Sequence, residues 1–319
     1  MTVVADAIVR PVSRRFGLRD FLSRMVREKP LGTVGGIIVL LFLLAAVFAN
    51  VIAPYPPNIS NVANKLAAPS AQHILGTDNL GRDQLSRIIY GARVSLYIGL
   101  GASLLNVIVA GIIGLLSGFI GSAFDLVVQR FVDIALSIPA LVILITVVSV
   151  VGAGVMQIVI VMGVIGGIQW ARVVRSAVLA IRNNVYMDAA KAAGGGIWHI
   201  IRRHVLSNIM PVMIIVFSVS IAGNILAEAG LSFLGLGIAP PTASWGGMLS
   251  QNGRTYMYQA PWLAIYPGVA LTVVVWGVNM WGDAIRDLLD PRLRGGVGRY
   301  GVAVKKIEGR KKKNTKEVA

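Results

Sequence analysis

The sequence predicts an all-α integral membrane protein with six transmembrane helices, and three observations support this prediction. Hydrophobic residues make up 55% of the 319-residue chain and charged residues only 14%, whereas a soluble domain carries about 25% charged residues. Uncharged apolar runs recur that reach about eighteen residues or more, the length that a helix needs to cross a bilayer. Lys and Arg gather between alternate runs, which is typical of a multi-span protein.

The N-terminal region predicts the first span. Residues 1–30 carry seven Lys or Arg residues and form a basic segment that we expect in the cytoplasm. The uncharged run from Leu31 to about Ala53 is too long, and its basic leader too extended, for a secretory signal peptide. We therefore interpret residues 31–93 as a first transmembrane helix followed by an extracytoplasmic loop that is polar and contains proline.

The central region predicts three further spans. The second span, at about Val94–Gly121, contains Gly114 and Gly118 at a spacing that favours close helix packing. A short turn with Asp125, Arg130 and Asp133 follows. The next 38 residues, 134–171, contain no charge and as one helix would be nearly twice as long as the roughly 30 Å hydrocarbon layer. This run is predicted to fold back at Gly152–Gly154.

The last two spans are expected at about Asn208–Ala229 and Trp262–Gly282, with a loop rich in proline and glycine at residues 230–261 between them. Residues 94–285 then form the core domain of five spans, and residues 286–319 form a basic cytoplasmic tail.

The distribution of basic residues supports six spans. With both termini in the cytoplasm, the inner segments carry 25 of the 30 Lys and Arg residues, as the positive-inside rule requires. Topology and the anionic inner leaflet therefore explain the formal net charge of +16, and no nucleic-acid partner is needed. The chain contains no cysteine, which excludes disulfides, thiolate metal sites and a cysteine nucleophile.

The inner loop at about residues 182–208 contains a polar, basic island, Asp188–Leu206. It begins with the good helix formers of residues 188–193. Gly194–Gly196 then interrupts the helix, and an amphipathic turn follows. This turn is expected to place Ile197, Ile200, Ile201 and His204 near one side, and Arg202 and Arg203 near the other. By composition alone, the island fits either a solvated loop or a surface that another protein binds.

The chemistry of an enzyme is missing from the sequence. It contains no phosphate-binding GxxxxGK[ST] pattern, no HExxH and no GxSxG motif. The spacing of His73, His199 and His204 fits no metal site, so we expect no metal, no cofactor and no catalytic residue. Transport and scaffolding remain, and the energy for transport would come from another polypeptide.

Within the island, a set of residues resembles the EAA loop of ABC importer permeases. These residues are Asp188, Ala189, Ala190, Gly194, Ile200, Arg203, His204 and Leu206. The usual loop begins with Glu and ends with Leu-Pro, whereas this chain has Asp188 and, after Leu206, Ser207. The resemblance implies a type I, MetI-like permease fold whose coupling helices dock into a groove on an ATPase subunit.

Two further signatures narrow the resemblance to the peptide/nickel uptake branch, and to its dipeptide/oligopeptide "C"-type permease. The first, in the outer loop, includes Gly76, Thr77, Asp78, Gly81, Arg82, Asp83, Arg87 and Arg93. The second runs from Glu228 to Gly237 and continues through Pro240-Pro241 and Ser244-Trp245-Gly246, and Asp283, Arg286-Asp287 and 289–292 match the C-terminal ending. The resemblance covers about residues 30–295.

The resemblance implies a permease in a prokaryotic inner membrane that imports short peptides. It implies as partners a homologous second permease, two ATP-binding-cassette ATPase subunits and an extracytoplasmic solute-binding protein. Nickel chelates, opines, glutathione or sugars are alternative cargoes of this branch. A stand-alone channel or secondary transporter is a remote alternative, because it would need ionisable residues at mid-span and no docking loop.

Two groups of residues outside the island keep alternative roles. In the outer loop, Asp78 can cap a turn and Asp83 can pair with Arg87 at i, i+4, or the loop can contact the solute-binding protein. Asn224 and Glu228 are candidate gate or pathway residues, because polar groups at membrane depth usually face a cavity or a partner. The alternative for Glu228 is a hydrogen bond that holds the loop after the fifth span.

Overall fold

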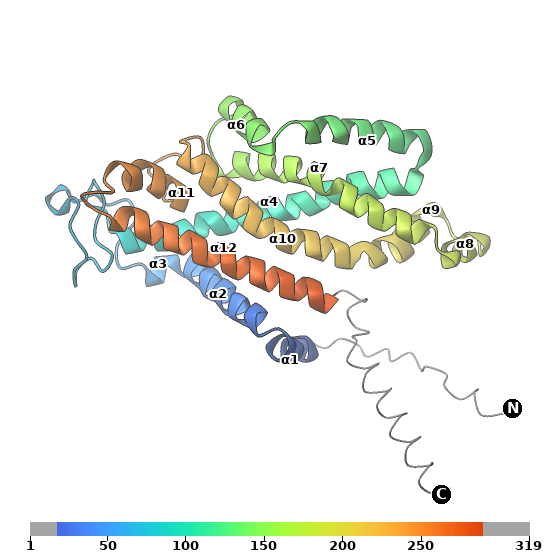
Figure 1. Cartoon of the computed structure of the whole chain (residues 1–319), viewed down its shortest axis with the longest axis horizontal. Coiled ribbons are helices and arrows are strands. Elements are labelled where there is room, and N and C mark those ends of the chain that lie inside the picture. The colour runs from blue at the N-terminus through green and yellow to red at the C-terminus, as the bar shows by residue number, and fades with distance from the viewer. Residues whose placement is uncertain (1–17, 290–319) are drawn as a thin grey trace, which may run out of the picture.

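The computed structural model describes residues 18–289, and helices form nearly all of its regular structure (Figure 1). The elements are α1 (Leu18–Glu28), α2 (Pro30–Val47), α3 (Ala49–Ile52), η1 (Val62–Asn64), α4 (Gln84–Ile120), α5 (Ser122–Ser137), α6 (Ala140–Val151), α7 (Val155–Arg182), α8 (Val185–Ala192), α9 (Ile197–Ile200), η2 (Ile201–Val205), α10 (Leu206–Phe233), α11 (Trp245–Met248), η3 (Leu249–Gly253) and α12 (Trp262–Leu289). Most of the basic segment at 1–30 and of the tail at 286–319 lies outside the described residues.

The helices agree with the predicted six spans, one of which is bent. Five helical segments are each long and apolar enough to cross a membrane, and α5 and α6 make a sixth span if the pair is counted as one. The two helices meet at an angle of 87°. The predicted break at Gly152–Gly154 is confirmed, because α6 ends at Val151 and Gly152 has a φ of +96°, an angle that favours glycine.

Four predicted boundaries differ from the ends of the helices. The short turn expected around Asp125 is the 16-residue helix α5, whose charged side chains are paired with α7. The helix that contains the second span begins at Gln84 rather than Val94, because the Asp83 side chain caps α4 and accepts a hydrogen bond from the Ser86 N–H at 2.8 Å. The fifth and sixth spans also extend beyond their predicted ends, to Phe233 and Leu289.

Close helix contacts hold the bundle together. The predicted packing at Gly114 and Gly118 is confirmed: α4 lies against α7, and a Cβ atom at Gly114 would come within 2.8 Å of the Ala171 carbonyl oxygen. At the other side, α2 packs along α12 (Figure 1). Trp245 from α11 is buried beside α2, α4 and α10, and its Nε1 donates to the Ile88 carbonyl oxygen at 3.0 Å.

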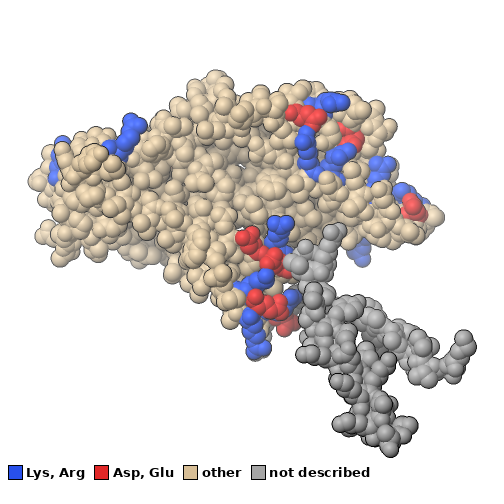
Figure 2. All heavy atoms as spheres, viewed as in Figure 1, with Lys and Arg blue, Asp and Glu red and all other residues tan. Residues whose placement is uncertain are grey.

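Charged side chains lie mostly toward one end of the described molecule. Figure 2 shows Lys, Arg, Asp and Glu around α8, around α5 and the adjoining part of α7, and near α1, with a broad uncharged body between them and the outer loop. Such a body suits a bilayer, since a charged group is costly in hydrocarbon.

Candidate functional site

Residues 185–206, which extend the island by three residues to the start of α8 and are called the island from here on, form two short helices joined by a glycine turn at one end of the bundle. Helix α8 ends at Ala192, Gly194 adopts a φ of +80°, and α9 begins at Ile197. The predicted succession of helix, glycine break and helix is therefore confirmed. In α8, Lys191 Nζ lies 3.2 Å from Asp188 Oδ1.

The second short helix continues into the fifth span without a break. The π-helical segment η2 connects α9 to α10, and residues 197–233 form one 37-residue helical segment. Ser207 lies inside this segment, so its replacement of the usual proline leaves no ill-defined end there. A proline at this position would lack the N–H that continues the helix.

Buried apolar side chains fix the island to the bundle. Met187, Ile200 and Val205 are 0–2% exposed and pack in one cluster with Val174 and Val178 of α7. A displacement of α8 or α9 must therefore be transmitted to α7 and α10, because a close-packed core moves as a body.

The opposite side of the island exposes large apolar side chains. Val185 is 85% exposed, Ile197 70% and Trp198 73%. The predicted grouping of Ile197 with Ile200 was wrong, because Ile200 is buried whereas Ile197 faces outward. Of the residues that carry the EAA resemblance, Ile200 is buried, Ala190, His204 and Leu206 are intermediate, and Asp188, Ala189, Gly194 and Arg203 are exposed.

Ion pairs connect α5 to α7 near the island. Arg175 Nε donates to Asp125 Oδ1 at 2.6 Å, and the Asp125 carboxylate also accepts a hydrogen bond from Ser117 of α4. Arg172 pairs with Asp133 of α5. The charged residues that the sequence predicted in a turn therefore hold α5 against its neighbours.

The outer signature folds around a buried carboxylate. Asp78 is 0% exposed and accepts hydrogen bonds from the backbone N–H groups of Leu80 at 2.8 Å and Arg82 at 3.0 Å. Arg82 Nε donates to Asp78 Oδ2 at 2.7 Å, and Arg87 Nε lies 3.7 Å from the same oxygen. The predicted turn cap at Asp78 is confirmed.

The predicted pair between Asp83 and Arg87 was wrong. The Asp83 carboxylate caps α4 and lies 2.9 Å from His73 Nδ1. Arg87 instead faces Asp78 and donates from Nη1 to the Pro57 carbonyl oxygen at 3.0 Å. Helical i, i+4 spacing permits a pair, but the cap already occupies the carboxylate.

The other signature residues complete the folded part of the outer loop around Asp78, which is called the outer unit below. Thr77 is 0% exposed, and its Oγ1 accepts from the Ala67 N–H at 2.8 Å. Gly76 and Gly81 have positive φ angles, and a Cβ atom at Gly81 would come within 1.7 Å of the Asn61 carbonyl oxygen. Arg93 Nε donates to the Ala46 carbonyl oxygen at 2.9 Å, which satisfies an acceptor at the end of α2.

Glu228 and Asn224 have different surroundings. Glu228 is 0% exposed, and its Oε1 accepts a hydrogen bond from Ser232 Oγ at 2.6 Å. Ser232 Oγ in turn accepts from the Ile238 N–H at 3.0 Å. The hydrogen bond that was the alternative for Glu228 is therefore present, and it holds the loop after the fifth span.

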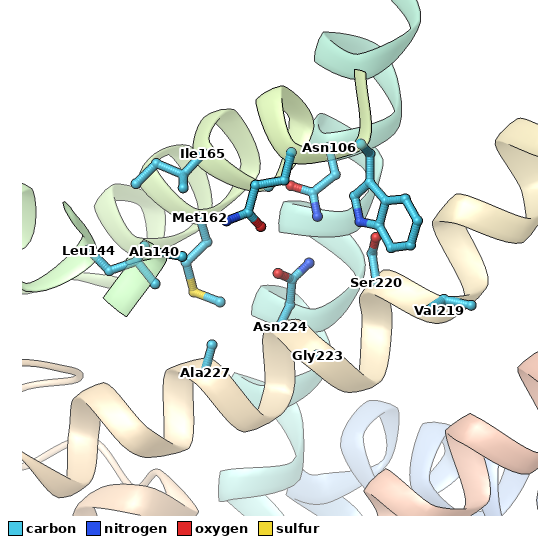
Figure 3. A pocket seen from close by; sticks show the side chains of 13 residues that line it. Asn106, Ala140, Leu144, Met162, Ile165, Val219, Ser220, Gly223, Asn224 and Ala227 are labelled. Atoms are coloured by element: carbon cyan, nitrogen blue, oxygen red, sulfur yellow. The ribbon is translucent and has the colours of Figure 1, made fainter. Parts of the chain in front are cut away.

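Asn224 lines a cavity of about 270 Å³ between α4, α6, α7 and α10. Figure 3 shows Asn224 on α10 and Asn106 on α4 with their amides toward each other. Asn224 Nδ2 donates to Ser103 Oγ at 2.9 Å. In the orientation of the Asn106 amide that satisfies its neighbours, its oxygen accepts from Asn224 Nδ2 at 3.2 Å. Its nitrogen then donates to the Gly163 carbonyl oxygen at 2.7 Å. Among the described residues, no charged side chain lines this cavity.

Sequence reasoning identified Asn224 but missed the other polar residues that line the cavity, Asn106, Gln169 and Ser220. It also missed the exposed Val185 and Trp198. The cavity residues come from distant spans, and no pattern in the sequence brings them together. Trp198 did carry a signal, since tryptophan is enriched among the residues that dominate binding at protein interfaces.

A bundle of spanning helices with an uncharged cavity and a short helical projection defines a membrane permease. Residues 110–295 match the family described as binding-protein-dependent transport system inner membrane component. The chain therefore belongs to this family, which confirms the resemblance found in the sequence. Residues 18–69 also match the N-terminal TM domain of oligopeptide transport permease C.

Similar proteins match nearly the whole chain. The oligopeptide transport system permease protein OppC of Bacillus subtilis is 36% identical over 276 residues, covering 86% of this chain and 90% of the relative. The probable D,D-dipeptide transport system permease protein DdpC of Escherichia coli is 35% identical, covering 85% and 91%. The glutathione transport system permease protein GsiD of Pectobacterium atrosepticum is 34% identical, covering 90% and 95%.

Proposed function

We propose that this chain is the permease subunit of an ATP-driven importer of short peptides. Its relatives include permeases named for dipeptide, D,D-dipeptide and oligopeptide transport. A homologous second permease would supply the other half of the pathway, two ATPase subunits the energy, and an extracytoplasmic solute-binding protein the cargo. Both termini would lie in the cytoplasm of a prokaryotic cell, and the subunit itself would need no cofactor.

Peptides are the preferred cargo, with glutathione, itself a small peptide, as the neighbouring alternative because a similar permease is named for it. A stand-alone transporter that couples to ions or protons is disfavoured, since none of the residues that line the described cavity is ionisable.

The island is the proposed ATPase dock, and the observation that carries this proposal is its exposed apolar surface. Val185, Ile197 and Trp198 project from a segment whose other side is packed into the bundle. Exposed apolar clusters of this kind mark protein interfaces, and Trp is enriched among residues that dominate binding energy. Exposed Arg202 and Arg203 beside them suit an acidic rim on the partner.

The structure also suggests how docking drives transport. Because residues 197–233 form one helical segment, a push on α9 displaces α10, which carries Asn224 in the cavity wall. ATPase closure would thus reopen or close the pathway as a rigid-body movement.

The outer unit would serve mainly as a scaffold. Asp78, Arg82 and Arg87 are 0–6% exposed and cannot offer their charges to a docking protein. Contact with the solute-binding protein would then fall on exposed neighbours such as Ile59, Val62 and Ile74, which are 60–73% exposed.

The substitution Trp198→Ala tests the dock. We expect it to weaken binding of the ATPase subunit by about 2 kcal/mol, or about thirtyfold in Kd, as truncation of an interface tryptophan typically does. Binding is measured by titrating the purified permease pair with the ATPase. Phe131→Ala is the control, because Phe131 is 69% exposed on α5 but lies outside the island. Equal binding by Trp198→Ala and wild type would contradict the dock.

A further inference from the structure

The cavity between α4, α6, α7 and α10 has unused hydrogen-bonding groups. Ser220 is 5% exposed, yet its Oγ has no hydrogen-bond partner in the described part of the chain. A buried hydroxyl without a partner is unfavourable, and a ligand in the cavity would supply that partner. Ser220 and Asn224 both line the cavity and lie one helical turn apart on α10.

The network around Asn224 leaves an acceptor for the cavity. Its Nδ2 is already used by Ser103 and Asn106, and no described group donates to its Oδ1. The Asn224 amide is thereby held in one orientation, since its Nδ2 faces α4, where Figure 3 shows Asn106. Gln169 and Trp170 of α7 add polar groups that bond to no described residue.

The ligand that fits these groups is neutral and carries both donors and acceptors. None of the 13 lining residues is charged, so a charged group would lose its hydration without gaining a counter-ion. Between its two charged termini a peptide backbone is neutral and presents an N–H and a C=O at every residue, so the cavity would take the interior of the peptide and not its ends. A cavity of about 270 Å³ has room for only a few such units.

The cavity wall also leaves room for a larger group at Gly223. A Cβ atom built there would meet no atom within 4 Å, although Gly223 lies between Ser220 and Asn224 on α10. By contrast, a Cβ atom at Gly166 across the cavity would come within 2.6 Å of the Asn106 side-chain amide. No described residue of this chain therefore fills the space above Gly223.

We propose that Ser220, Gly223 and Asn224 form a contact site for the backbone of peptide cargo, with Gly223 setting the width available to the cargo. This assignment rests on the peptide import proposed above and adds where, and through which groups, this subunit touches the peptide.

The absence of cysteine permits a direct test with Gly223→Cys. The substitution places one thiol of this chain in the cavity without displacing any neighbour. The variant is reconstituted in proteoliposomes with its partner permease, ATPases and binding protein, and treated with N-ethylmaleimide. With trialanine at about ten times its Kd for the complex, occupancy of the site slows labelling of this chain about tenfold.

Leu226→Cys is the matched control, because Leu226 is 56% exposed on the same helix and does not line the cavity. Protection of Gly223→Cys alone supports the site. Equal labelling with and without trialanine, in a variant complex that still imports it, overturns the site and leaves peptide import intact. If the wild-type complex imports neither trialanine nor longer peptides, the proposed cargo fails, and the site fails with it.

Discussion

At the scale of single residues, the outer unit depends on one carboxylate. Asp78 faces two arginines, Arg82 and Arg87, whose side chains are 7% and 6% exposed. Removing one partner of a buried ion pair costs about 3–5 kcal/mol, because a charge is left without compensation. We therefore expect Asp78→Asn to lower the free energy of unfolding of the outer unit by about this amount, measured by chemical denaturation in detergent.

The control for this prediction is Asp133→Asn. Asp133 also pairs with two arginines, Arg130 and Arg172, but its side chain is 41% exposed. Solvent-exposed pairs contribute about 0–1 kcal/mol. Similar losses in the two variants would show that burial does not set the strength of the Asp78 pairs.

Prediction from sequence was least accurate for the partners of individual side chains. The cap at Asp78 was predictable, because it depends on neighbouring residues. The choice of Arg87 between Asp78 and Asp83 was not, because it depends on how α4 begins. The pairing of Asn106 with Asn224 joins two spans far apart in the chain, and only the packed bundle determines it.

At the scale of elements, Gly194 controls the angle between α8 and α9. Its φ is +80°, and a residue with a Cβ atom pays about 1–2 kcal/mol in this region. The space around Gly194 is empty, so Gly194→Ala changes the backbone preference without a clash. We expect ATPase binding to weaken about 5- to 30-fold, measured by the same titration as for Trp198→Ala.

Gly196 offers a matched control two residues away. It also has empty space around it, but its φ of −62° suits any L residue. Gly196→Ala is therefore expected to bind the ATPase like the wild type. A loss of affinity as large as that of Gly194→Ala would indicate that the turn does not tolerate a methyl group, whatever its backbone angle.

The existence of the apolar spans followed from hydropathy and glycine positions, whereas helix α5 and the shape of the elements did not. The break at Gly152 was predictable, because 38 uncharged residues exceed one bilayer crossing. The 87° bend between α5 and α6 was not, because the ion pairs from Asp125 to Arg175 and from Asp133 to Arg172 hold α5 against α7.

At the scale of the whole molecule, the charge distribution and the helix order imply one orientation in the membrane. The island that would bind the ATPases and the outer unit lie at opposite ends of the bundle (Figure 1). We infer from the positive-inside rule that the island would lie in the cytoplasm, since 25 of the 30 basic residues fall on the segments expected inside in the six-span arrangement. With five crossings the two termini would lie on opposite sides of the membrane, and one of the two basic terminal segments would lie outside.

Single cysteines in this cysteine-free chain test the orientation. Val185 of the island is 85% exposed and Tyr258 of the last outer loop is 94% exposed, so a thiol at either position is accessible to water-soluble reagents. In intact spheroplasts, a membrane-impermeant maleimide is expected to label Tyr258→Cys and to spare Val185→Cys, because the bilayer blocks its passage. After permeabilisation both variants should react, which serves as the accessibility control. Labelling of Val185→Cys in intact spheroplasts would place the island outside, where no ATP is available, and would contradict its role as an ATPase dock.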